Sequence, residues 1–150
     1  MSESNNLGKS RKNKSRCVAM QFIYSISLCP TENPQEAFQS FIDYTGLPNS
    51  CAKYAEFLSL GLLQNLDDIN DIISRNLENW KIGRIAKVEM AILQLAVFEM
   101  IYGENVPFKV ILNEMVECAK EYGSAESGSF VNGILDSIYH HSLSLDLVSA

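Results

Sequence analysis

MAILQLAVFEMIY, residues 90 to 102, is apolar at every position except Gln94 and Glu99. A surface helix carries apolar residues on one face only, whereas a helix that is apolar nearly all round is buried. The run therefore predicts a helix over about residues 85–102 at the centre of a helical bundle.

Helical spacing continues on both sides of this run. Ala19, Phe22, Ile23 and Ile26 fall at i, i+3, i+4 and i+7, which is the spacing of one helix face. The same spacing predicts further helices over about 34–45, 51–77 and 107–122 and over the segment after Gly123. The pair Asp67-Asp68 leaves open whether 51–77 forms one helix or two.

No segment alternates between apolar and polar residues as a strand does, so we predict an all-α fold with six to seven helices in two packed groups. We expect a basic arm without secondary structure over residues 1–11, one helical domain over 12–141, and a frayed tail over 142–150. The two halves of the domain are expected to join near 78–83.

The charges are distributed unevenly. The first 16 residues hold five of the 12 basic residues and one of the 18 acidic residues, although the net charge is -6. Lys12, Lys14 and Arg16 lead into a helix that carries Gln21 and Tyr24, a combination that suits single-stranded RNA. A targeting peptide, or a solvated tail with Tyr24 packed in the core, explains the same residues.

Catalytic, metal and cofactor sites are not expected. The four cysteines form no C-x-x-C pair, and the only histidines, His140 and His141, are adjacent. Gly8-Lys9-Ser10 lacks the earlier glycine and the strand that a phosphate-binding loop needs. The cysteine pattern favours reduced, partly buried thiols in a cytoplasmic protein. No stretch reaches the roughly 18 apolar residues of a membrane span.

Several segments resemble the NusB family, in order and at the family's spacing. They cover about residues 12–138, and the most specific is FVNGILD at 130–136. The others are RCVAMQFIY at 16–24, FLSLGLLQN at 57–65, Asn79-Trp80 with Arg84 and the segment 88–99, and the segment 106–123 with its VPFKV start.

The resemblance implies a non-catalytic transcription antitermination factor with two three-helix groups. It implies pairing with NusE, which is also a ribosomal protein, binding of boxA-like single-stranded RNA, and action within an RNA polymerase antitermination complex. By position, Tyr24 and Glu89 match residues that face the protein partner. The residues that match the RNA-facing side are Lys12, Lys14, Arg16, Gln21, Tyr122, Glu126, Ser129 and Phe130.

The chain departs from the family pattern in three ways. Lys12 and Lys14 stand where arginines are usual, and lysine lacks the planar guanidinium fork. Gln94 replaces a frequent arginine, and Ser129 replaces a common lysine. We therefore expect weaker RNA binding, or binding that depends more on the partner. The alternatives are an N-terminal domain of a ribosomal RNA cytosine methyltransferase and a helical adaptor without RNA contact.

Overall fold

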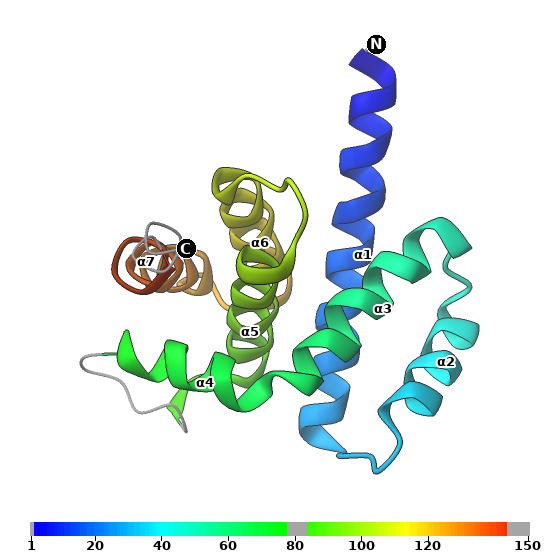
Figure 1. Cartoon of the computed structure of the whole chain (residues 1–150), viewed down its shortest axis with the longest axis horizontal. Helices are drawn as coiled ribbons and strands as arrows, with labels where there is room; N and C mark the ends of the chain where they lie inside the picture. The colour runs from blue at the N-terminus through cyan, green and yellow to red at the C-terminus, as the bar shows by residue number, and fades with distance from the viewer. Residues whose placement is uncertain (1, 78–83, 144–150) are drawn as a thin grey trace. The chain divides into compact units, whose positions relative to one another are not determined.

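The structure is a computed structural model that describes residues 2–77 and 84–143, with side chains from Arg11 onward. All regular elements in these two ranges are helical, which confirms the predicted all-α class (Figure 1). They are α1 (Ser2–Leu28), α2 (Pro34–Thr45), α3 (Asn49–Gln64), α4 (Leu66–Arg75), α5 (Lys87–Tyr102), α6 (Phe108–Tyr122), α7 (Ser127–Ile138) and a π-helical turn (Tyr139–Leu143).

The chain divides into two compact units, and the first ends at Gln64. It contains α1, α2 and α3, with α3 packed against both other helices (Figure 1). The predicted face of α1 is its buried face, since Ala19, Phe22 and Ile23 are almost fully buried. The ring of Phe22 meets the ring of Phe38 edge to face, with centroids 5.1 Å apart, and so joins α1 to α2.

Local signals fix the ends of α2. The side chain of Asn33 accepts a hydrogen bond from the backbone N–H of Glu36 at 3.1 Å, and Pro34 occupies the first turn. At the other end Gly46 adopts φ +68°, the left-handed conformation that glycine reaches without strain. Both the start at Pro34 and the end at Gly46 are as the sequence predicts.

The segment predicted as one helix or two forms two, α3 and α4. The break lies at Asn65, just before the acidic first turn of α4 with Asp67 and Asp68. The division between the two compact units also falls here, between Gln64 and Asn65. The join expected at 78–83, with Trp80, lies outside the described residues.

The second unit is built around α5. Every residue from Ala91 to Glu99 is buried, and α4, α6 and α7 pack around this helix. The polar group of Gln94 has a partner, because its Nε2 donates a hydrogen bond to Asn70 Oδ1 at 2.8 Å. The central position expected for this helix is therefore confirmed.

Two details differ from the expectations. α1 begins at Ser2, so the backbone of the predicted arm is helical, and no proline interrupts the chain before Leu28. A glycine inside the FVNGILD run would favour close helix packing at Gly133, but a Cβ there would meet nothing within 4 Å. Gly128 makes the close approach instead, because its Cβ would lie 3.0 Å from Lys120 Cγ.

Candidate functional site

The residues assigned to RNA or partner contact divide between the two units. The first unit carries Lys12, Lys14, Arg16, Gln21 and Tyr24, all on α1. The second unit carries Glu89, Tyr122, Glu126, Ser129 and Phe130, on α5, α6 and α7.

The turn between α6 and α7 brings four of the predicted residues together. Tyr122 is the last residue of α6 and is 38% exposed. Glu126 occupies the N-cap position of α7, where its backbone carbonyl accepts the N–H of Phe130 at 3.1 Å. Its side chain makes no capping hydrogen bond. Glu126 and Ser129 are exposed and Phe130 is half-buried, so the turn presents two aromatic rings and two polar groups.

Ser127 holds this turn, although the sequence analysis did not single it out. Its hydroxyl is buried, accepts the N–H of Ser124 at 2.9 Å and donates to Glu89 Oε2 at 2.7 Å. Serine is favoured at the N-cap position, but Glu126 occupies that position here, so the preference did not mark Ser127. The carboxylate of Glu89 is too distant in sequence for any local pattern to reveal it.

Glu89 lies in the first turn of α5 and is half-buried. A carboxylate in that position is favoured by the helix dipole. Its hydrogen bond with Ser127 gives it a role within the fold, and the partner contact assigned to it stays a prediction.

Lys14 and Gln21 share one face of α1, because residues seven apart in a helix differ by about 20° in direction. Lys14 is exposed and Gln21 is half-buried, as is Tyr24. Lys12 is half-buried as well, and its Nζ lies 5.1 Å from the ring centroid of Tyr54 on α3. These positions allow a ligand to reach α1 from solvent.

Arg16 does not fit the role of an RNA-facing cation. It is only 2% exposed, and its Nη1 donates a hydrogen bond to Asn13 Oδ1 at 2.7 Å. It falls three, four and seven residues before Ala19, Met20 and Ile23, so it shares the buried face of α1. This placement argues against a direct phosphate contact and favours a positioning role.

The part of the chain that the structure describes also bears on disulfide bonds, metal binding and membrane insertion. Cys17, Cys29, Cys51 and Cys118 are free thiols. No group of three His, Cys, Asp or Glu side chains among those residues is arranged to hold a metal ion. None of the described helices is long and apolar enough to cross a membrane.

The family model of the NusB family matches residues 13–140. The transcription antitermination protein NusB of Clostridium botulinum is 40% identical over 126 residues, covering 83% of this chain and 94% of that protein. The NusB structure of T. maritima has a TM-score of 0.80 at 31% identity and covers 87% of this chain and 91% of that one.

A solved complex of the antitermination factors NusB and NusE with double-stranded RNA is also similar. Its matching chain has a TM-score of 0.79 at 27% identity, and the match covers 87% of this chain and 97% of that one. The family-model match contains every residue assigned to a contact except Lys12. This chain belongs to the NusB family.

Proposed function

We propose that this protein is a cytoplasmic, non-catalytic transcription antitermination factor. It pairs with NusE and binds boxA-like single-stranded RNA in the leaders of ribosomal RNA transcripts. The pair then joins the RNA polymerase antitermination complex and makes the polymerase less prone to termination. No covalent step is involved, so the function rests on binding two partners at once.

The observation that carries the proposal is the family match over residues 13–140. The match over residues 13–140 contains every residue assigned to a contact except Lys12, which lies just before it on α1. It also includes FVNGILD, the most specific run in the sequence. The similar complex of NusB and NusE with RNA supports both partners.

The RNA contacts follow from the chemistry of each side chain. Tyr122 and Phe130 offer ring faces on which bases stack, and Ser129 offers a hydroxyl for a base edge or a phosphate. On α1, Lys12 and Lys14 neutralise phosphates, and Gln21 supplies an amide for base edges. Arg16 is buried, so its role is to hold α1 in position and not to contact the RNA.

The partner contacts involve Tyr24 and Glu89. A tyrosine combines a large apolar ring with a polar hydroxyl and is enriched at protein interfaces. A carboxylate that meets a basic group of NusE adds charge complementarity. Such complementarity fixes how the two proteins are aligned and raises their association rate.

The test is co-purification with NusE, followed by titration with boxA-like RNA and with a scrambled RNA, each with and without NusE. We expect a stable pair that binds the boxA-like RNA more tightly than either the lone protein binds it or the pair binds the scrambled RNA. A pair that forms without RNA affinity would identify an adaptor. Failure to pair with NusE would contradict the proposed partnership.

A further inference from the structure

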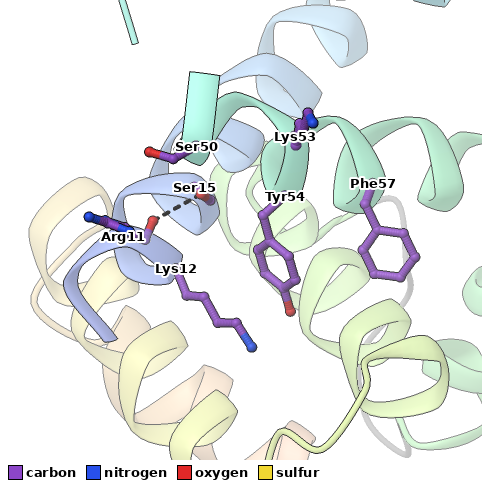
Figure 2. Close-up of a pocket in the computed structure, with 7 residues that line it drawn as sticks. All are labelled: Arg11, Lys12, Ser15, Ser50, Lys53, Tyr54 and Phe57. Carbon is purple, nitrogen blue, oxygen red and sulfur yellow. Dashed lines mark hydrogen bonds between the residues drawn. The ribbon is translucent and has the colours of Figure 1, made fainter. Parts of the chain in front are cut away.

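The first unit contains a groove between α1 and α3. Of the residues that line it, only Lys12 is among those assigned above to RNA or partner contact. The groove has a volume of about 420 Å³, within the usual range of ligand pockets, and it opens to solvent. Arg11, Lys12 and Ser15 line it from α1, and Lys53, Tyr54 and Phe57 line it from α3 (Figure 2).

The two walls of the groove are held together by Ser15. Its buried hydroxyl donates across to the backbone carbonyl of Cys51 on α3 at 2.8 Å. The same hydroxyl lies 2.9 Å from the carbonyl oxygen of Arg11 on its own helix, so its single proton is shared between the two. The groove is therefore a fixed feature of the α1–α3 contact.

The charge of the groove is opposite to that of the chain as a whole. Three of its lining residues, Arg11, Lys12 and Lys53, are cationic, and none of the described lining residues is acidic. The whole chain carries a net charge of -6. An anionic group is therefore favoured at this place and disfavoured over most of the remaining surface.

The groove also presents aromatic rings. Tyr54 and Phe57 project from α3 in the same direction, with centroids 5.9 Å apart and planes tilted by 39° (Figure 2). Lys12 extends from α1 toward the Tyr54 ring, with its Nζ 5.1 Å from the centroid. Because the rings contact each other, a planar ligand stacks on an outer face. Phe57, which is 40% exposed, offers the larger surface.

Cations beside stacking faces are the combination that binds single-stranded nucleic acids. We propose that the α1–α3 groove binds one nucleotide of single-stranded RNA. Its base stacks on Phe57, which Tyr54 supports from behind, and its phosphate lies beside Lys53, while Arg11 adds positive charge from α1. Lys12 positions the Tyr54 ring and adds positive charge. This proposal rests on the proposed RNA-binding function and extends it to residues on α3.

The test uses the full chain paired with NusE and a boxA-like RNA with additional nucleotides at both ends. Phe57→Leu keeps an apolar side chain but removes the stacking face, and we expect about 5- to 30-fold weaker binding. Lys53→Gln removes one cation, and the slope of log K against log salt should become shallower by about 0.7. Both side chains are exposed, so both variants should melt like the wild type.

Two matched variants serve as controls. Tyr44→Leu removes a ring that is 91% exposed on α2, and Lys109→Gln removes an exposed cation on α6. Neither residue lines the groove, so RNA binding should stay within about twofold of the wild type. Photocrosslinking with 5-iodouridine in the RNA should place an adduct on Phe57 or Tyr54.

Four results would overturn the proposed nucleotide site in the groove. If the wild type binds RNA and both groove variants bind equally well, the groove is wrong while the RNA-binding function stands. Adducts confined to residues outside the groove would have the same meaning. If the groove variants lose NusE but keep RNA, the groove is a protein-binding surface. If the wild type itself does not bind RNA, the proposed function fails and the groove fails with it.

Discussion

The hydroxyl of Ser127 donates a hydrogen bond to Glu89 Oε2 at 2.7 Å, linking the first turn of α7 to the first turn of α5. Ser127 is buried and also accepts the N–H of Ser124. A residue assigned to the protein partner is thereby bonded to the turn that presents the proposed RNA contacts. Changes at Glu89 should therefore affect both functions.

Glu89→Lys should weaken pairing with NusE. If Glu89 meets a basic group at a largely desolvated interface, the change replaces attraction with repulsion and costs about 2 to 5 kcal/mol. Isothermal titration calorimetry measures this loss. Ser127→Ala is the control for the internal hydrogen bond, since it removes the donor and keeps the carboxylate. Wild-type affinity of Glu89→Lys for NusE would remove Glu89 from the interface.

Gly123→Ala should destabilise the α6–α7 turn. A Cβ at Gly123 would lie 2.7 Å from Ser127 Cβ and 2.8 Å from the carbonyl oxygen of Ala119, so the serine must move. Overpacking of this kind costs roughly 1 to 3 kcal/mol. Thermal melting and RNA titration should show a lower melting temperature and weaker RNA binding.

Gly133→Ala provides the opposite case on α7. A Cβ there meets nothing within 4 Å, and alanine is favoured over glycine inside a helix by roughly 0.5 to 1 kcal/mol. This variant should be more stable than the wild type, with unchanged RNA binding. If both glycine variants melt at the same temperature, the stability of the turn does not depend on the close contact between residue 123 and Ser127.

Local sequence patterns predicted most of the fold because its determinants are local. The apolar run at 90–102 predicted the buried α5, and the apolar spacing over 34–45 predicted α2 with its observed ends. The missed features depend on contacts between helices. Tyr54 lies in the segment 51–77 that was predicted to be helical, and only the α1–α3 packing places Lys12 over its ring.

The burial of Arg16 is a second feature that was not predicted, although for a different reason. Arginine is almost never fully buried unless it is paired, so its position beside Lys14 suggested an exposed basic cluster. The helical period of α1 instead places it among Ala19, Met20 and Ile23. The same period is visible in the sequence, so at this position the helical spacing is a better guide to burial than the residue type.

Lys12 and Lys14 should carry part of the electrostatic binding to RNA. Each neutralised phosphate adds about 0.7 to the salt slope of single-strand binding, so the double alanine variant should flatten the slope by about 1.4. Fluorescence titration at several salt concentrations measures the slope. An unchanged slope would place the RNA away from these lysines.

Arg16→Ala should act on stability. It removes a buried guanidinium together with its hydrogen bond to Asn13. Loss of a buried, hydrogen-bonded group costs roughly 1 to 3 kcal/mol. Thermal melting should show a drop for this variant and none for Lys14→Ala, whose side chain is exposed. Equal melting temperatures for the two variants would contradict the positioning role.

Glu126→Gln separates two opposing roles of one carboxylate at the N-cap of α7. There the charge is favoured by the helix dipole, by roughly 0.3 to 1 kcal/mol. The side chain makes no capping hydrogen bond, so its contribution to the helix is this charge. If RNA passes the α6–α7 turn, the same charge repels phosphate and competes with it for the helix N-terminus. The neighbouring Ser129 supplies no compensating cation.

We therefore expect Glu126→Gln to melt slightly below the wild type and to bind RNA more tightly. The gain should be larger at low salt, where screening is weak. RNA titration at two salt concentrations, alongside a melting curve, measures both effects. Weaker binding at both salt concentrations would mean that Glu126 accepts a hydrogen bond from a base. Equal binding at both would place Glu126 away from the path of the RNA, because an exposed charge within a Debye length of a phosphate must affect its binding.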